Sequence, residues 1–375
     1  MTAPPVLDVL EELITTTVDP AAAEVDATGA FPRAAVTALG SQGLLGLLSA
    51  PEVGGQGGSL ADAATVVRRL AASCGSTAMV VAMHYSATAV IEQHGPEDVR
   101  RAIAEGRHLS TLAFSERGSR SQFWAPLSTA RVDGDQVTLD ASKSWVTSAG
   151  EADSYVWTSR PATAPEGASL WLVPADAAGL KVAAPFDGLG LRGNASSPVE
   201  AVDVRLPLSS RLGDDGAGLD IALGVVLPVF QIVNASSSLG LMDAAIGKAI
   251  AHVTSARLEH LDQRLADQPV IRQHVAAMKD EADAASTLVD DAIGALGAGR
   301  PDAPLRMLQS KAVASEAALS VLATAMRLGG GAAFRKDVGI ERHFRDAQAA
   351  AVMAPTTDAL QEFIGRALCG LPLFG

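Results

Sequence analysis

Residues 127–149 read LSTARVDGDQVTLDASKSWVTSA, and this stretch decides how the rest of the chain is divided. Apolar and polar residues alternate along it, and Asp133-Gly134 interrupts it. A period of two predicts strands, and Asp-Gly between two such runs predicts a turn. Shorter runs of the same kind follow: SYVWTSR (154–160), SLWLVP (169–174), GLKVAAP (179–185) and VEAVDVRLP (199–207). The sequence therefore predicts a small antiparallel β domain over residues 111–216.

Helical periodicity occupies the chain on both sides of this domain. SLADAATVVRRL (59–70) begins with Ser59 as an N-cap, and an almost wholly apolar helix, expected to be buried, follows over 76–95. Long Ala-rich helices are predicted over about 219–257, 268–298, 302–328 and 356–369. The expected fold class is α+β, mostly α, with a helical domain over 1–110, the β domain over 111–216 and a four-helix bundle over 217–375.

Composition excludes several classes of protein. The 375 residues are 48% hydrophobic and include 29 Lys+Arg against 42 Asp+Glu, so the formal net charge is −13. The sequence contains no run of Lys and Arg, so it gives no indication of a nucleic-acid partner. The start of the chain has no signal-peptide pattern and no run of about 20 apolar residues occurs, so we expect no membrane span and a cytoplasmic protein. The only cysteines, Cys74 and Cys369, are expected to be buried free thiols.

The motifs of metal and hydrolytic chemistry are absent from the sequence. It has no HExxH, CxxC or G-x-S-x-G, and its seven histidines are scattered, so no metal site is predicted. Gly188–Gly193 fits G-x-G-x-x-G, but a turn and a strand flank it where a dinucleotide site needs a strand and a helix. We interpret these glycines as turn residues. The chemistry is therefore expected to come from a bound organic cofactor.

Three segments together carry a more specific pattern. LAFSERGSRS (112–121) precedes KSWVTSA (143–149), a Gly-Gly-Gly run occupies 329–331, and ERHFRDA occupies 341–347. With the order helices, β domain, helices, this pattern resembles the acyl-CoA dehydrogenase superfamily of flavoproteins over essentially the whole chain. The resemblance implies an FAD-dependent oxidoreductase that forms a homodimer or homotetramer and acts on a small-molecule or acyl-thioester substrate.

The resemblance also implies a set of binding residues. In this family the segment matching Ala113–Ser115 lines the flavin ring, the Trp matching Trp145 packs on it, and the Thr matching Thr147 reaches toward its N5 edge. Ordinary strand packing is the alternative for Trp145 and Thr147. The residues carried over to the FAD site are Phe114, Ser115, Trp145, Thr147, Arg257, Gly329, Gly330 and Thr356. Those carried over to the substrate are Ser121, Gln231 and Ala354.

Two departures from the family pattern concern the catalytic base. The Glu that removes the substrate α-proton in dehydrogenases matches Ala354, and the alternative position for it falls in Leu227–Val233, which holds Gln231 but no carboxylate. Losing a positioned base costs roughly 10²–10⁴ in rate. The sequence therefore favours the flavin-dependent monooxygenases of the same fold, which lack this Glu and take reduced flavin from a separate reductase.

An oxygenase needs polar groups that handle protons in a dry pocket. His84, on the predicted buried helix, is the first catalytic candidate, with Asn234 and Ser236 as further polar groups. Core packing is the alternative for His84, and helix packing for Ser236. Two other functions stay open: an acyl-CoA or acyl-carrier-protein dehydrogenase with a relocated base, and a catalytically silent flavin- or acyl-binding subunit.

Overall fold

The computed structural model describes residues 6–120 and 122–374. The chain forms two compact units. The first contains Met1–Val66, Met79–Gly188 and Arg192–Phe230, and the second contains Val67–Ala78, Leu189–Leu191 and Gln231–Gly375. The three-domain division made from the sequence stays a prediction.

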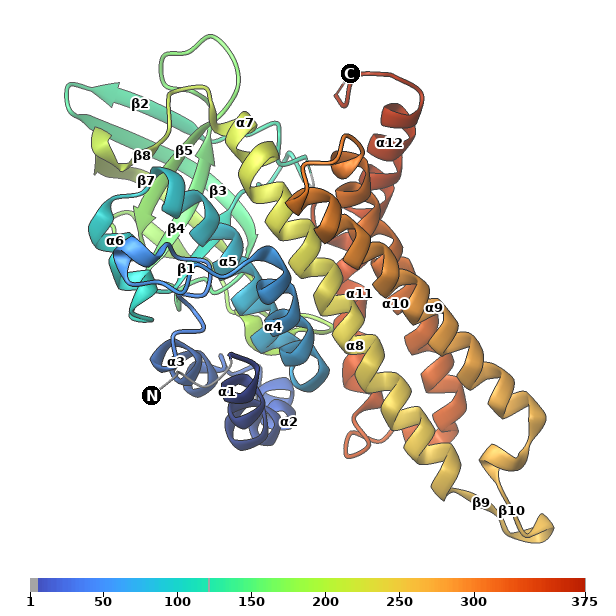
Figure 1. The fold of residues 1–375 in the computed structure, drawn as a ribbon. Coiled ribbons are helices and arrows are strands. Elements are labelled where there is room, and N and C mark those ends of the chain that lie inside the picture. The colour runs from blue at the N-terminus through green and yellow to red at the C-terminus, as the bar shows by residue number, and fades with distance from the viewer. Residues whose placement is uncertain (1–5, 121, 375) are drawn as a thin grey trace. The chain divides into compact units, whose positions relative to one another are not determined.

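Helices fill the N-terminal part of the chain, as predicted (Figure 1). The Ser59 hydroxyl accepts a hydrogen bond from the Asp62 N–H at 3.2 Å, and Asp62 accepts one from the Ser59 N–H at 2.8 Å. This reciprocal cap confirms the predicted helix start. The middle of α5 is buried, as its apolar sequence predicted. The helices are α1 (Val6–Leu13), α2 (Asp19–Thr28), α3 (Arg33–Ser41), α4 (Leu60–Ser73), α5 (Gly75–His94) and α6 (Glu97–Ala104), with a π-helical turn at Ile14–Val18.

The first unit also contains two four-stranded sheets. One has the order β1 (Ser110–Ala113), β4 (Ser154–Ser159), β5 (Ser169–Pro174), β8 (Arg211–Leu212). The other has the order β2 (Thr129–Asp133), β3 (Gln136–Val146), β7 (Ser197–Pro207), β6 (Leu180–Val182). The predicted strands are confirmed, and they pair antiparallel as expected. The exception is β1, which pairs with β4 in parallel, so the antiparallel prediction is wrong for this pair. The β2–β3 hairpin lies in the long connection that parallel pairing requires.

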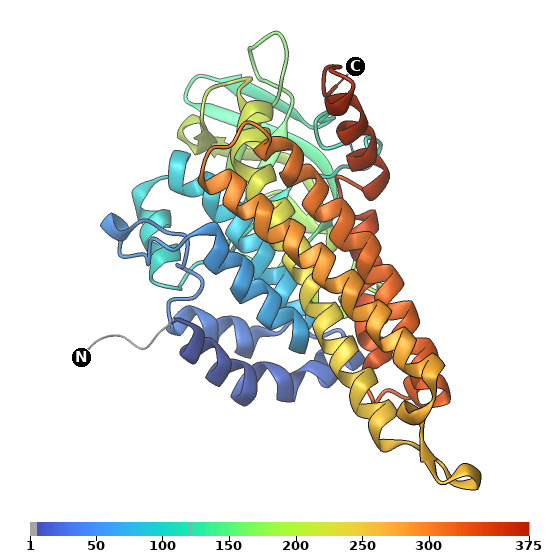
Figure 2. The same cartoon turned by 45° about the vertical axis from the view of Figure 1, so that its right-hand side comes forward.

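The second unit is a helical bundle (Figures 1 and 2). In both views α9 and α10 run side by side, and α11 and α12 also pack on α10. The helices are α7 (Gly218–Ile221, in the first unit), α8 (Leu227–Ser255), α9 (Pro269–Gly297), α10 (Ala303–Ala333), α11 (Ile340–Val352) and α12 (Thr357–Leu368). A short hairpin of β9 (Arg257–Leu258) and β10 (Gln263–Arg264) connects α8 to α9. Of these helices, α11 was not predicted from the sequence.

The most apolar helices are buried within the protein. Gly218–Ser255 and Ala303–Ala333 are long and apolar enough to cross a membrane, but 61% and 56% of their most apolar windows are buried, as in core helices. This burial accounts for their composition. Cys74 is also buried, whereas Cys369 is exposed at the end of α12, so the expectation of two buried thiols was wrong for Cys369.

Candidate functional site

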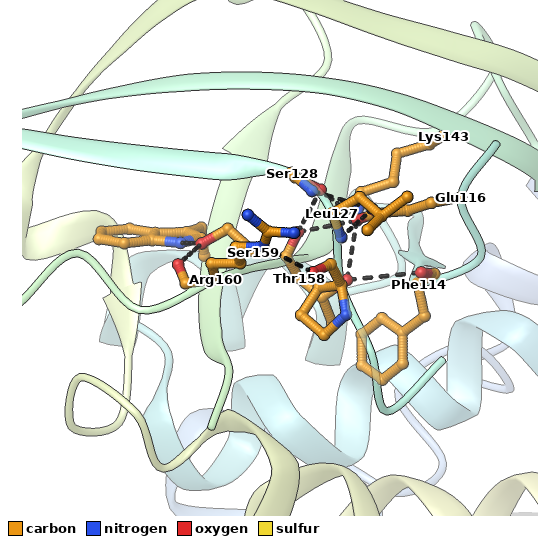
Figure 3. A network of polar contacts seen from close by, with 10 residues as sticks. Phe114, Glu116, Leu127, Ser128, Lys143, Thr158, Ser159 and Arg160 are labelled. Carbon is orange, nitrogen blue, oxygen red and sulfur yellow. Dashed lines mark hydrogen bonds and ion pairs between the residues drawn. The ribbon is translucent and has the colours of Figure 1, made fainter. Parts of the chain in front are cut away.

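A buried ion pair fixes the segment that follows β1 (Figure 3). Lys143 on β3 donates hydrogen bonds to Glu116 and, at 2.7 Å each, to the backbone and side-chain oxygens of Thr158 on β4. The Ser128 hydroxyl and the backbone N–H groups of Leu127 and Ser128 also donate to Glu116. Every partner of the pair therefore comes from a strand or from the loop before β2, and the carboxylate ties these elements together.

The environment of this pair explains its protonation. Burial lowers the pKa of Lys143 to about 8, because the charged ammonium loses its water, and the negative charge of Glu116 opposes the shift. Burial by itself raises the pKa of Glu116, but the Lys143 charge and the hydrogen bonds to the carboxylate outweigh this, so the pKa lies below its ordinary value. Near neutral pH both groups are charged, and the pair is a structural anchor.

The anchor holds the predicted flavin-binding residues of the first unit. The Ser144 N–H donates to the Ser115 carbonyl at 2.9 Å, so the Phe114–Glu116 segment lies beside β3. Next to it Trp145 has a φ of +57°, and the ladder between β3 and β7 is shifted between Lys143 and Val146. The Trp145 side chain is 71% exposed. A positive φ is uncommon for a bulky residue, and here it accompanies a large aromatic side chain that lies exposed at the end of β3.

Thr147 is the first residue after β3, two positions beyond Trp145. It is buried, and its hydroxyl lies 3.1 Å from the hydroxyl of Ser196. The structure therefore brings Phe114, Ser115, Trp145 and Thr147 together at the ends of β1 and β3. Ser121, predicted to contact substrate, lies outside the described residues.

His84 is fully buried on α5, and both ring nitrogens contact the backbone. Nδ1 accepts a hydrogen bond from the Ser110 N–H at 3.1 Å, so the ring proton is on Nε2, which lies 3.1 Å from the Leu45 carbonyl oxygen. Burial lowers the pKa of His84 to about 4. A neutral imidazole bridging two backbone segments favours the packing role over proton transfer, because neither nitrogen is open to a substrate.

The two other catalytic candidates lie on α8 in the second unit and differ from each other. The Ser236 hydroxyl donates to the Ile232 carbonyl of its own helix at 2.8 Å, which favours the helix-packing alternative. Asn234 is buried, and its Nδ2 contacts the Met353 sulfur at 3.7 Å. Its Oδ1 has no hydrogen-bond partner among residues 6–120 and 122–374. Of the three catalytic candidates, Asn234 alone keeps a polar atom available.

Gln231 lies one turn before Asn234 and is fully buried. Within the described part of the chain neither its Oε1 nor its Nε2 has a hydrogen-bond partner. Leaving a buried amide unsatisfied costs about 1–3 kcal/mol for each group. Gln231 and Asn234 are therefore suited to a polar ligand, and the contact with Met353 places Asn234 beside the segment that contains Ala354.

The segment between α11 and α12 is held by a buried lysine that the sequence analysis did not single out. Lys311 on α10 donates to the carbonyl oxygens of Ala350, Met353 and Pro355 at 2.9, 3.1 and 2.8 Å. At the end of this segment Thr356 caps α12, and its hydroxyl accepts from the Ala359 N–H at 3.3 Å. A lysine among the apolar residues of SKAVASEAAL (310–319) was the signal that could have identified it.

The glycine run matched to an FAD contact lies near the end of α10. Gly330 has a φ of +49° and interrupts the helical backbone, a conformation that favours glycine. A Cβ on Gly329 would lie 2.6 Å from the Ala333 Cβ and 3.4 Å from Ile340 at the start of α11. The fold therefore requires both glycines. Arg257, on the hairpin after α8, is ion-paired with Asp262.

Comparison with known proteins identifies the family. Residues 5–106, 111–204 and 216–369 match the N-terminal, middle and C-terminal domains of acyl-CoA dehydrogenase. The chain is 28% identical to the probable acyl-CoA dehydrogenase YngJ of Bacillus subtilis over 93% of both proteins. It is 29% identical to the human mitochondrial short-chain specific acyl-CoA dehydrogenase, covering 90% of this chain and 83% of the relative.

Solved structures show the same fold. Butyryl-CoA dehydrogenase from Megasphaera elsdenii superposes with a TM-score of 0.91 at 23% identity and 97% coverage of both chains. FkbI, described as serving biosynthesis of the methoxymalonyl extender unit of the Fk520 polyketide immunosuppressant, superposes with a TM-score of 0.86 at 25% identity, covering 96% of this chain and 99% of FkbI. The chain belongs to the acyl-CoA dehydrogenase family of FAD-binding flavoprotein oxidoreductases.

Proposed function

We propose that this flavoprotein is an oxygenase that acts on a small or thioester-linked acyl substrate, carried by CoA or by a carrier protein. In the balanced reaction one oxygen atom of O2 enters the substrate and the other becomes water, which consumes two electrons and two protons. A separate flavin reductase is the proposed source of the electrons. We further propose a cytoplasmic homodimer or homotetramer, because the family pattern implies contacts between subunits.

The residues present fit FAD in each unit. In the first unit, the exposed indole of Trp145 offers an aromatic face for a planar ring. In the second unit, Thr356 caps α12, whose N-terminus is the positive end of the helix dipole. Thr357 is buried there, and its hydroxyl has no hydrogen-bond partner among the residues that the structure describes. This unpaired hydroxyl and the helix N-terminus suit the polar and anionic part of the cofactor.

Bound FAD would supply two-electron redox chemistry and, when reduced, reactivity toward O2. In the first unit Trp145 would contact the flavin ring, and in the second unit Thr356 would contact a polar part of the cofactor. Phe114, Ser115 and Thr147 would line the ring, held in place by the Glu116–Lys143 anchor. In the second unit Gln231 and Asn234 would bind the polar part of the substrate with neutral amides, which donate and accept hydrogen bonds but do not remove a weakly acidic proton.

The observation that carries the proposal is that, among the residues that the structure describes, neither α8 nor α11 offers an available carboxylate to replace the base missing at Ala354. On α11, Glu341 is ion-paired with Arg345, and Asp346 accepts a hydrogen bond from the Leu191 N–H at 2.6 Å. On α8 the first carboxylate is Asp243, four turns into the helix, and it is ion-paired. Neither α8 nor α11 therefore provides a carboxylate that could act as the base in place of the Glu missing at Ala354, and this disfavours removal of the substrate α-proton.

The alternative is an acyl-CoA or acyl-carrier-protein dehydrogenase with a base elsewhere, and the names of the curated relatives favour it. The two functions differ under anaerobic conditions. An oxygenase should leave the oxidised flavin unchanged when acyl thioesters are added, and the reduced protein should then consume O2 and transfer one ¹⁸O atom from ¹⁸O2 to product. Rapid anaerobic bleaching by an acyl thioester, without ¹⁸O incorporation, would exclude the oxygenase.

Trp145→Ala tests the flavin contact in the first unit. If the indole packs on the ring, its loss should weaken FAD binding about tenfold, since an aromatic pair contributes roughly 0.5–1.5 kcal/mol beyond its buried area. Trp145→Phe keeps an aromatic face and should recover most of the affinity. Titration of the apoprotein with FAD gives the dissociation constants. An affinity unchanged in Trp145→Ala would contradict the assignment.

A further inference from the structure

Lys311 is a buried ammonium with no carboxylate partner among the described residues. Its side chain is fully inaccessible to solvent in the middle of the bundle. Buried charges are normally paired, because an isolated ammonium in a medium of low dielectric constant loses several kcal/mol of hydration. A lysine in this position therefore needs another source of stabilisation or a function that retains it.

Backbone carbonyls provide that stabilisation. The three protons of an ammonium match its three acceptors, the carbonyl oxygens of Ala350, Met353 and Pro355. Ala350 belongs to the last turn of α11, and Met353 and Pro355 belong to the connection that leads to α12. One side chain on α10 thus fixes the end of one helix and the path to the next.

The tethered segment contains the groups that the proposed site uses. Ala354 lies between two of the anchored carbonyls, and Thr356, the cap of α12, follows directly. Two buried polar side chains at this segment have an atom without a hydrogen-bond partner among the described residues. One is Asn234, which contacts the Met353 sulfur, and the other is Thr357 in the first turn of α12. A shift of this segment would move the helix N-terminus and the Thr357 hydroxyl together.

We propose that Lys311 is a positioning residue whose positive charge holds residues 353–357 in the conformation that binds FAD. It touches neither cofactor nor substrate, and it acts through the three carbonyls. The inference rests on the proposed contact of the α12 N-terminus with FAD, but not on whether the enzyme is an oxygenase or a dehydrogenase. An apolar side chain would satisfy core packing at position 311, so the proposed positioning role explains why a charged residue is present there.

The charge on Lys311 should change within the accessible pH range. Burial lowers its pKa from 10.5 to about 7, and no neighbouring charge contributes to the shift. The neutral amine has two protons, so at least one of the three carbonyls loses its hydrogen bond when Lys311 deprotonates. The charged and titratable residues of the three helices packed on α10 have no described ion pair with Lys311. They are Arg272, His274, Lys279, Asp280, Glu281, Asp283, Asp290 and Asp291 on α9, Glu341, Arg342, His343, Arg345 and Asp346 on α11, and Asp358, Glu362 and Arg366 on α12.

FAD titration of the apoprotein between pH 6 and 9 tests the proposal. In the wild type the affinity should fall as the pH rises through about 7, the pKa of Lys311. Lys311→Met, which has a similar volume but no donor, should bind FAD at least tenfold more weakly at pH 6 and should show no step near pH 7. Lys279→Met, at an exposed lysine of the same bundle, should behave as the wild type.

The proposal is overturned if Lys311→Met retains wild-type affinity at pH 6, or if its pH profile keeps the wild-type step. Should Lys311→Met not fold, hydrogen–deuterium exchange on the wild type decides. The amides of 353–357, corrected for intrinsic exchange, should lose protection between pH 6 and 8.5, while those in the middle of α9 keep theirs. Unchanged protection would reject the tether. Neither readout involves turnover, so failure of the oxygenase proposal leaves both results interpretable.

Discussion

Replacing Lys143 with methionine is expected to lower the free energy of unfolding of the first unit by about 3–5 kcal/mol, because it leaves the buried Glu116 carboxylate without its counter-charge. The Ser128 hydroxyl and two backbone N–H groups still donate to Glu116, but they do not supply a full positive charge. Urea denaturation followed by tryptophan fluorescence measures this unit specifically, since all four tryptophans (Trp124, Trp145, Trp157 and Trp171) belong to it.

A second variant separates the charge from the packing. Glu116→Gln combined with Lys143→Met removes both charges, so the double variant should be more stable than Lys143→Met alone. Lys181→Met, at an exposed position on β6, should change stability by less than about 0.5 kcal/mol. If Lys143→Met lost no more stability than Lys181→Met, the buried pair would not be the anchor of the 114–116 segment.

The Glu116–Lys143 pair makes the free energy of unfolding depend on pH in the acidic range. The pKa of Glu116 lies below its ordinary value of 4.5 in the folded protein, so the unfolded chain takes up its proton first as the pH falls. The stability contributed by Glu116 is therefore fully present above about pH 4.5 and is lost as the pH falls through the lower folded value. Glu116→Gln should remove this part of the acid sensitivity.

Local patterns were enough to predict most of the fold. Period-two alternation located β2, β3 and β7, and Ser59 located the start of α4, because each signal depends on residues near in the sequence. The four residues of β1 are too few for a periodic signal, and their parallel pairing with β4 depends on residues about 44 positions away. The helix predicted over 302–328 ends before the glycine run, whereas α10 continues to Ala333, and no helix was predicted at Ile340–Val352, where α11 lies.

The candidate site was less predictable, because its geometry depends on tertiary contacts. Glu116 and Lys143 were part of the recognised motif, but only the structure shows that they form a buried pair. For His84, the decisive facts are the backbone groups of Ser110 and Leu45, which come from two other segments. Lys311 gave no motif at all, since its acceptors are main-chain carbonyls about 40 residues further along the chain.

Ala354→Glu should turn the protein into a better dehydrogenase. The substitution places a carboxylate at the family position of the base, on a segment already anchored on both sides by Lys311. A positioned general base contributes typically 10²–10⁴-fold, so anaerobic bleaching of the flavin by an acyl thioester should accelerate by about that factor. Stopped-flow absorbance measures the rate, and it should rise with pH above about 4–5 as the new carboxyl ionises.

Ala354→Gln is the matched control, because it has nearly the shape of the glutamate variant without its basicity. Its bleaching rate should stay at the wild-type level, and both variants should bind as much FAD as the wild type. A rate in Ala354→Glu no higher than in Ala354→Gln would mean that position 354 does not face the substrate α-carbon. The absence of a carboxylate there would then carry no information about the reaction, and the argument for an oxygenase would lose its main support. A gain limited to Ala354→Glu would instead show that the site binds an acyl thioester in a reactive orientation, and that alanine at this position is what suppresses dehydrogenation.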